Sequence, residues 1–388
     1  MALRIRHASA LRVLLAAGLV AAACVFPASR LALAQSKAAG SEKNFQALAD
    51  QAGQAQRAGK TQESIRLYLQ ALQIRPQWVD GWRNLGMLLA ERKDYARAET
   101  AFKNLLQIEP KNGSAWALLG LTEFERGGYD VALRDIVHAR RLGVPNADLS
   151  KLALFHEALL LIHKGEFEAA EPLLMNLVHA DVNDPDLVAA LGLDALRIPS
   201  FPDQLRADRQ AFVNRIGAID FQGFHGSVEE ASSAYQQLIA EQPEAKGLHF
   251  AYGKMLASAG KFDQCIEEMG KELDLNPSDD MAMLQIAMTE LNLNQPARSL
   301  PYAEKAVRVA PKLFASHYVL GRTLDKLAQT DRAIVELEMA TKLAPSTPEI
   351  HYALFQAYSH ANRKADALRE RQVFANLTQK EQHGDGTP

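Results

Sequence analysis

A proline that recurs at a fixed interval is the feature that most constrains this chain. Pro76 and Pro110 are 34 residues apart, and Pro145 follows Pro110 by 35 residues. The 34-residue interval then holds three times in succession in a second series, which consists of Pro243, Pro277, Pro311 and Pro345. A period of this length is typical of a solenoid, in which each unit packs mainly against its neighbours. The 388 residues therefore predict one repeat array rather than two or three unrelated domains.

Each proline is preceded by the same pattern of side-chain sizes. A small residue stands twelve positions before it, and in most units a larger residue follows four positions after the small one, on the same face of a helix. A small residue allows two helices to approach closely, and the larger one fills the adjacent space. The pairs are Ser64 with Tyr68, Ala98 with Phe102, Ala231 with Tyr235, Cys265 with Met269, Ser299 with Ala303, and Ala333 with Leu337.

The pairs above define the second helix of each unit, and the first helix is indicated by a segment that ends in glycine, as in Tyr252-Gly253 and Leu320-Gly321. Longer examples run from Trp82 to Gly86 and from Trp116 to Gly120. Glycine inside a helix costs about 1 kcal/mol relative to alanine, so its presence there indicates a close contact. Turn residues such as Gly127-Gly128 and Gly260-Lys261 separate this helix from the next one. Each unit therefore reads as helix, tight turn, helix.

This pattern resembles the tetratricopeptide repeat family over roughly residues 43 to 378. The resemblance implies an all-α fold, namely a right-handed solenoid of helical hairpins with about eight to nine units in two blocks. The residues that match the family's pattern most fully are Trp82, Leu85, Gly86, Ala98, Phe102 and Pro110.

The 34-residue interval between prolines is lost after Pro145 and resumes only at Pro243, which divides the array into two blocks. We expect an N-terminal repeat block at 43–185, an irregular connecting segment at 186–225, and a C-terminal block at 226–378 that ends in a polar capping helix. The tail, 379–388, is expected to be disordered. Within the connecting segment, the prolines of 198–202 prevent a helix. Two interpretations stay open for 198–202, a hinge or a longer loop inside one rigid superhelix.

The N-terminus has the three parts of a secretory signal peptide, which we place at 1–34. Basic residues come first, an apolar stretch runs from Val13 to Phe26, and Ala32-Leu33-Ala34 forms a cleavage site. The apolar stretch is too short for a stable membrane span. We therefore expect an exported protein, periplasmic or secreted. A signal anchor, or a lipoprotein attached through Cys24, is the alternative.

The charge and the absence of catalytic motifs narrow the functional classes. The formal net charge is -3, and removal of four leader arginines without any acid gives -3 - 4 = -7, which argues against a nucleic-acid partner. No phosphate loop, dinucleotide fingerprint, nucleophile elbow or zinc-binding helix is present in the sequence. His249, His317 and His351 occupy equivalent places in different units, too far apart to share a metal, so we expect them to pack. The sequence thus predicts no enzyme, no cofactor and no metal.

In the tetratricopeptide family, the first helices of the hairpins line the concave wall and their inward residues contact the partner. On that resemblance we expect a protein or peptide partner, although the carboxylate-binding pattern of some relatives is missing here. The alternative is that four members of this set only pack against the next helix, namely Phe250, Leu284, Tyr318 and Tyr352. The candidate binding residues are Arg83, Asn84, Phe250, Lys254, Leu284, Met288, Tyr318, Arg322, Tyr352 and Gln356.

The leading functional prediction is an exported scaffold or adaptor that binds a peptide or protein segment in its concave groove, in a cell-envelope assembly. The alternative is a solenoid sensor for a small molecule or oligosaccharide, in which tyrosines would stack against sugar rings.

Overall fold

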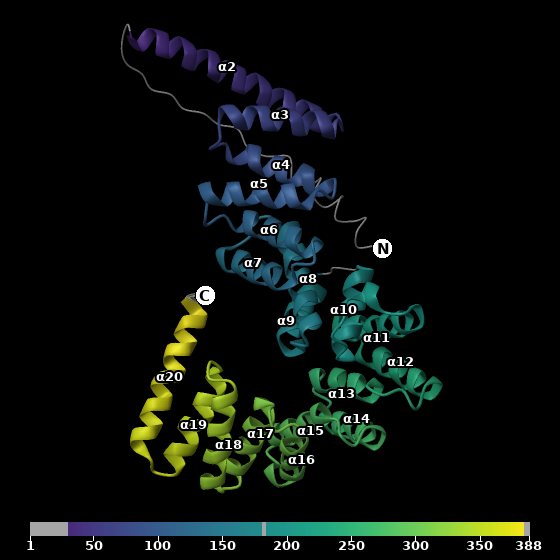
Figure 1. The fold of residues 1–388 in the computed structure, drawn as a ribbon. Helices are drawn as coiled ribbons and strands as arrows, with labels where there is room; N and C mark the ends of the chain where they lie inside the picture. The colour runs from purple at the N-terminus through teal and green to yellow at the C-terminus, as the bar shows by residue number, and fades with distance from the viewer. Residues whose placement is uncertain (1–29, 181–183, 384–388) are drawn as a thin grey trace. The chain divides into compact units, whose positions relative to one another are not determined.

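The computed structural model describes residues 30–180 and 184–383 (Figure 1). These residues form nineteen α-helices and one short 3-10 helix, and no strand occurs among them. The predicted all-α fold is therefore confirmed. The chain separates into two compact units, which we describe in turn.

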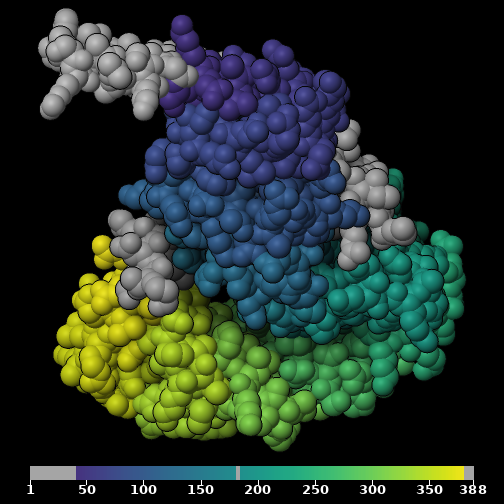
Figure 2. Space-filling view, turned by 45° about the horizontal axis from the view of Figure 1, so that its top comes forward, coloured from purple at the N-terminus to yellow at the C-terminus, as the bar shows by residue number. Residues whose placement is uncertain are grey.

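Unit 1 contains the described residues up to Ala190 together with Ile198–Leu205. Its helices pair in sequence order as hairpins, α2 with α3, α4 with α5, α6 with α7 and α8 with α9. In the space-filling view, these hairpins follow one another as layers coloured purple to blue (Figure 2). The helices are α2 (Arg30–Arg57), α3 (Thr61–Ile74), α4 (Val79–Glu91), α5 (Tyr95–Ile108), α6 (Gly113–Glu125), α7 (Tyr129–Leu142), α8 (Ala147–Lys164), α9 (Phe167–His179) and the first part of α10 (Pro185–Ala195).

Unit 2 contains Leu191–Arg197 and the described residues from Arg206 onward. Five further hairpins pair α11 with α12 and continue in order to α19 with α20. The helices are α11 (Ala207–His225), α12 (Val228–Glu241), α13 (Leu248–Ser258), α14 (Phe262–Leu275), α15 (Asp280–Asn292), α16 (Pro296–Val309), α17 (Phe314–Lys326), α18 (Thr330–Leu343), α19 (Pro348–His360) and α20 (Lys364–His383).

The described residues therefore hold nine hairpins, which agrees with the predicted solenoid of eight to nine units. The segment 186–225, expected to be irregular, consists largely of α10 and α11. Its prolines interrupt the helices only between 196 and 206, where the 3-10 helix Pro202–Gln204 lies. Helix α20 continues to His383, so part of the tail expected to be disordered is helical; residues 384–388 lie outside the described range.

The leader prediction falls mostly outside the described residues, which begin at Arg30. The apolar stretch and Cys24 are not among them. Of the helices that the structure describes, none is both long enough and apolar enough to cross a membrane.

In four hairpins a glycine of the first helix meets a large side chain of the second, namely Gly86 with Phe102, Gly120 with Ile136, Gly253 with Met269, and Gly321 with Leu337. A Cβ atom added to Gly86 would lie 2.5 Å from the Phe102 ring, and one added to Gly321 would lie 2.6 Å from Leu337. Both distances are shorter than any van der Waals contact, so a methyl group at either position would force the facing side chain to shift. The small residues that precede the large ones by four positions are all fully buried, as the sequence predicts: Ser64, Ala98, Ala231, Cys265, Ser299 and Ala333.

In one hairpin, an alanine replaces the glycine of the first helix and another alanine replaces the large residue of the second. In α15 the glycine position is occupied by Ala287, and in α16 the large residue is replaced by Ala303. Both alanines are fully buried in one core cluster. An added methyl on the first helix is thus matched by a smaller side chain on the second.

Four of the recurring prolines are each linked to the first helix that follows them, namely Pro76, Pro110, Pro311 and Pro345. The indole Nε1 of Trp82 donates to the carbonyl oxygen of Pro76 at 2.8 Å, and Trp116 bonds Pro110 in the same way. His317 replaces tryptophan in its hairpin, and its Nε2 lies 3.0 Å from the Pro311 carbonyl oxygen. The proline carbonyl, which the corner leaves outside the helical ladder, therefore receives a ring N–H six residues later.

The turns inside the hairpins show the same period in their backbone. One residue in each turn has a positive φ, which glycine adopts freely and other residues adopt at a cost. Lys93, at φ 61°, and Ala328, at φ 57°, adopt it without being glycine. The full series is Gly59, Lys93, Gly127 and Gly165 in unit 1, and Gly226, Gly260, Asn294, Ala328 and Asn362 in unit 2.

The glycine contact leads to a test by a double-mutant cycle. Gly321→Ala should lower the free energy of unfolding by about 1–3 kcal/mol because the methyl collides with Leu337. Leu337→Ala should lower it by about 2–5 kcal/mol through a cavity. The double variant reproduces the Ala287 and Ala303 arrangement, so its loss should be smaller than the sum of the single losses by about 1 kcal/mol or more. Urea denaturation of the three variants measures this, and additive losses would contradict the proposed contact.

Candidate functional site

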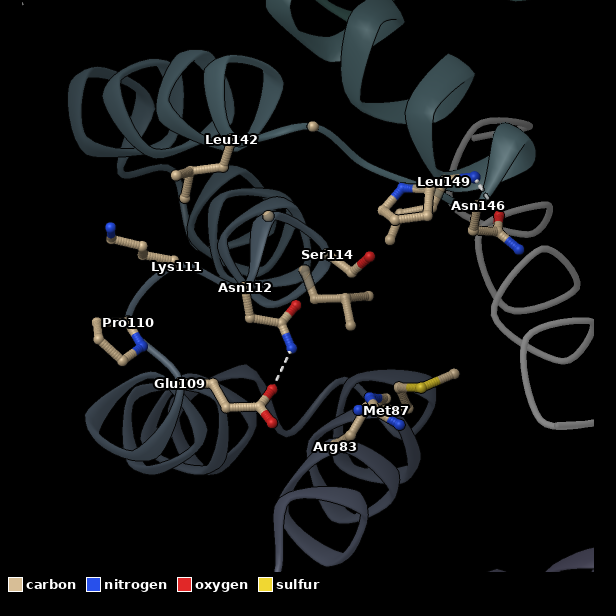
Figure 3. Close-up of a pocket in the computed structure, with 14 residues that line it drawn as sticks. Arg83, Met87, Glu109, Pro110, Lys111, Asn112, Ser114, Leu142, Asn146 and Leu149 are labelled. Atoms are coloured by element: carbon tan, nitrogen blue, oxygen red, sulfur yellow. Dashed lines mark hydrogen bonds between the residues drawn. The ribbon is translucent and has the colours of Figure 1, made fainter. Parts of the chain in front are cut away.

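Unit 1 contains an open pocket of about 830 Å³ between the ends of three first helices (Figure 3). Side chains from α4, from the corner between α5 and α6, and from the corner between α7 and α8 surround it. Helix α6 contacts both α4 and α8, so the pocket lies where successive first helices meet. The lining residues are Arg83, Met87, Glu109, Pro110, Lys111, Asn112, Gly113, Ser114, Leu118, Leu142, Gly143, Pro145, Asn146 and Leu149.

The two corners are built by asparagine caps that follow the periodic prolines. Asn112 Oδ1 accepts a hydrogen bond from the backbone N–H of Ala115 at 3.0 Å, which caps the start of α6. Asn146 Oδ1 accepts one from Leu149 at 2.8 Å and caps α8. Because each carboxamide oxygen is occupied by its own helix, the amide nitrogen of each cap is the group left to contact other polar atoms. Asn112 Nδ2 donates to Glu109 Oε2 at 2.7 Å.

The pocket combines an apolar floor with polar groups at its edge. Met87, Leu118 and Leu149 are buried, and Leu142 is partly exposed at the rim. Arg83 is half-buried and forms an ion pair with Asp80 one helical turn earlier. A floor of this kind, with hydrogen-bond donors around it, fits an extended peptide whose apolar side chain is buried and whose carbonyl oxygens face the donors.

Arg83 is the predicted site residue that lies in this pocket. Its neighbour Asn84 does not line it; Asn84 Nδ2 donates to the Tyr68 hydroxyl at 3.1 Å, and that hydroxyl donates to Gln56 at 2.8 Å. Asn84 therefore joins α4 to the hairpin before it. The rest of the pocket was not predicted from the repeat pattern, although Asn112 and Asn146 follow Pro110 and Pro145 by two residues and one residue.

In unit 2, two predicted residues lie in the core. Phe250 on α13 and Leu284 on α15 are buried, which favours the packing alternative at these positions. A third predicted residue is paired, because Lys254 Nζ donates to Asp194 Oδ2 at 2.6 Å. The lysine side chain is mostly buried and the aspartate more so, which makes the pair a link between α10 and α13.

The remaining predicted residues of unit 2 are accessible. Met288 on α15 is 40% exposed and Tyr352 on α19 is 44% exposed. Arg322 lies over the Tyr318 ring, 5.5 Å from its centroid, and both are half-buried. First helix α17 contacts α15 and α19, so these residues occupy neighbouring rows. We call this set the C-terminal strip: Met288, Tyr318, Arg322, Tyr352 and Gln356.

The Tyr352 ring packs against two other aromatic rings. It lies 5.3 Å from Phe374 of α20 and 6.0 Å from Phe355 of its own helix, measured between centroids. Because these contacts hold the ring in place, little side-chain entropy remains to be lost when a partner packs on it.

The three equivalent histidines pair with glutamates rather than with one another. The Nδ1 atoms of His249, His317 and His351 each lie 2.7 Å from a carboxylate oxygen nineteen residues later in the same hairpin. The acceptors are Glu268, Glu336 and Glu370. Among the described residues, no group of three or more His, Cys, Asp or Glu side chains is placed to hold a metal ion.

At Glu268, hydrogen bonds together change the pKa of the carboxyl group more than burial does. Burial alone would raise the pKa of Glu268, but hydrogen bonds from His249 and Lys271 hold that pKa below its ordinary value. The carboxylate is therefore ionised at neutral pH and fixes the imidazole ring against α14.

A pair of buried carboxyl groups lies elsewhere in unit 1. Glu123 of α6 and Asp135 of α7 are both buried, and Glu123 Oε2 has no hydrogen-bond partner among the described residues. Burial, followed by the neighbouring Asp135, raises the pKa of Glu123 from 4.5 to about 7. Neither residue lines the pocket, so we assign the pair a structural role.

Comparison with known proteins identifies the repeat. The tetratricopeptide repeat family model matches residues 79–112 and, in a second version, residues 223–280. Tetratricopeptide repeats are therefore present in both units. BBSome complex member BBS4 of Bos taurus is 20% identical over 81% of this chain and 61% of its own length. Protein CTR9 homolog of Arabidopsis thaliana is 22% identical over 73% of this chain and 27% of its own length. The chain thus spans only about three fifths and a quarter of these relatives.

Solved structures overlap smaller parts of the chain. MamA from Desulfovibrio magneticus RS-1 is 24% identical and covers 44% of this chain and 96% of its own, with a TM-score of 0.38. YrrB, described as a tetratricopeptide protein with an unusual peptide-binding site, is 18% identical and covers 44% and 92%, with a TM-score of 0.37.

The shifted pKa of Glu123 gives a pH-dependent prediction. Because the folded pKa, about 7, lies above the ordinary 4.5, its contribution to stability is present below about pH 4.5 and is lost as the pH rises through 7. Glu123→Gln cannot ionise, so it should resemble the wild type at pH 4.5 and be more stable at pH 8, by on the order of 1–3 kcal/mol. Thermal unfolding at both pH values measures this. Glu63→Gln, on the surface of α3, is the control and should show no such change.

Proposed function

We propose that this chain is an exported protein-interaction scaffold whose unit 1 pocket binds an extended segment of a partner protein. The observation that carries the proposal is the pocket itself, which is lined both by buried Met87, Leu118 and Leu149 and by the donors Arg83 and Lys111. A tetratricopeptide solenoid supports such a role because stacked hairpins present a long continuous wall.

The C-terminal strip is proposed as a second contact for the same kind of partner. Tyr352 and Met288 are the exposed apolar anchors, and Arg322 supplies a planar donor beside the Tyr318 ring. Tyrosine, methionine and arginine are enriched at protein interfaces because they give a large contact area with few conformations to fix. Two separate contacts would let one partner engage both units with more avidity than either contact alone.

A cell-envelope assembly is the proposed setting. Its support is the sequence of the leader, with a basic start, an apolar stretch and Ala32-Leu33-Ala34 before Gln35. Export would also suit a chain whose described part holds a single buried cysteine, Cys265, and needs no disulfide to fold.

The pocket is tested with two matched charge substitutions on one helix. Leu142 lines the pocket and is 36% exposed, whereas Val131, also on α7, is 37% exposed and does not line it. Leu142→Glu places a carboxylate against the apolar floor and should weaken binding of the partner at least about tenfold, whereas Val131→Glu should leave it unchanged. The measurement is capture from a cell-envelope extract of the source organism, followed by titration of the purified partner. Equal binding by both variants would remove the pocket from the proposal, and capture of no protein would favour the small-molecule alternative.

The proposed export is tested by the mass of the mature protein. The mass of the protein recovered from its native cells should correspond to a chain that starts at Gln35. A chain that starts at a lipidated Cys24 would establish the lipoprotein alternative instead, and a chain that retains its arginine-rich start would contradict cleavage.

A further inference from the structure

The segment Ile198–Leu205 belongs to unit 1 although the residues on both sides of it belong to unit 2. The chain enters unit 2 within α10, returns to unit 1 for these eight residues, and enters unit 2 again at Arg206. A connecting loop without a specific role would not need this return. We call these eight residues the strap.

Phe201 is the anchor of the strap. Its side chain is only 4% exposed and lies in a socket of aromatic rings from three helices of unit 1. It stacks on His163 of α8, with 4.2 Å between centroids and 13° between planes. Tyr129 at the start of α7 lies 4.8 Å away and Phe124 near the end of α6 lies 5.5 Å away. Contacts of this geometry fix an aromatic ring more specifically than general apolar packing does.

The strap has internal structure of its own. The carbonyl oxygen of Phe201 accepts from the backbone N–H of Gln204 at 3.1 Å, and that of Pro202 accepts from Leu205 at 3.3 Å. Pro199 and Pro202 restrict the backbone on each side of the anchor. The strap therefore presents Phe201 from a turn that is already formed, and less entropy is lost when the ring enters the socket.

One feature of the socket opposes closure. The Nδ1 atom of His163 is buried and has no hydrogen-bond partner among the described residues. Docking of the Phe201 ring on this imidazole keeps water away from a polar atom and gives no bond in return. The apolar gain of burying Phe201 is thus partly offset, as expected for a contact that opens reversibly.

We propose that the strap is a releasable clasp on unit 1. When Phe201 occupies the socket, the eight residues are held on α6, α7 and α8. When it leaves, they become a free loop whose two flanking residues, Arg197 and Arg206, stay in unit 2. Opening requires no change in α6, α7 or α8, so the socket helices remain folded in both states.

Hydrogen exchange of the full chain, followed by mass spectrometry, tests this. In the wild type, amides of the strap should exchange more slowly than in a free peptide but at least tenfold faster than those of α6 and α8, because the strap opens alone. Phe201→Ala should bring strap exchange to the free-peptide rate and leave α6 and α8 unchanged. The control is Phe212→Ala, which removes a ring from α11 that contacts Arg209 rather than the socket.

Tryptic cleavage provides a second readout, because Arg197 and Arg206 flank the strap. Phe201→Ala should be cut at these sites at least tenfold faster than the wild type and Phe212→Ala, with Phe201→Leu between them. Circular dichroism establishes that each variant is folded. The proposal is overturned if strap amides of the wild type exchange only as fast as those of α6 and α8, since the strap would then be a fixed part of the core. It is equally overturned if a folded Phe201→Ala keeps wild-type exchange and cleavage.

Discussion

The whole array depends on how closely the two helices of a hairpin approach each other. At Gly86 and Gly321 the first helix has no side chain, and the facing ring or Leu side chain of the second helix occupies the space. The hairpin with Ala287 and Ala303 shows that the total volume matters more than which helix supplies it. Since each hairpin packs on the next, an error in this spacing would be passed along the stack. The pocket between α4, α6 and α8 keeps its dimensions for the same reason.

The links between hairpins rely on a different interaction. A ring N–H reaches back six residues to a proline carbonyl, and either Trp82 or His317 can supply it. Histidine offers a second nitrogen, which the array uses for a glutamate nineteen residues later, as in His317 with Glu336. A position that resembles a metal ligand in the sequence thus strengthens the contact between two helices. Because these bonds use buried histidines, the exposed residues of the first helices are not needed to hold the hairpins together.

The period and the size pattern were sufficient to predict the fold, because local spacing determines which helix faces meet. The candidate site was less predictable. Phe250 and Tyr352 occupy equivalent positions in different hairpins. Phe250 is buried and Tyr352 is exposed, because exposure depends on which side chains the neighbouring hairpin places there. The pocket draws on residues from three units, from Arg83 to Leu149, and no single repeat contains its pattern. The paired glutamates follow their histidines at a constant nineteen residues, a signal that the sequence does contain.

The bond from ring to proline carbonyl also has a mechanical meaning. It joins the end of one hairpin to the beginning of the next, so a stretching force applied along the chain meets these joints in series. Each hairpin that detaches would release about 34 residues, and an extended chain of that length measures about 110–120 Å. Hairpins that carry Trp82, Trp116, His317 or His351 at the joint have this bond to break, whereas Met283 offers no N–H to form it. An array under tension would therefore lengthen in steps, and the joint before α15, where Met283 cannot form this bond, would offer less resistance than the four joints that have it.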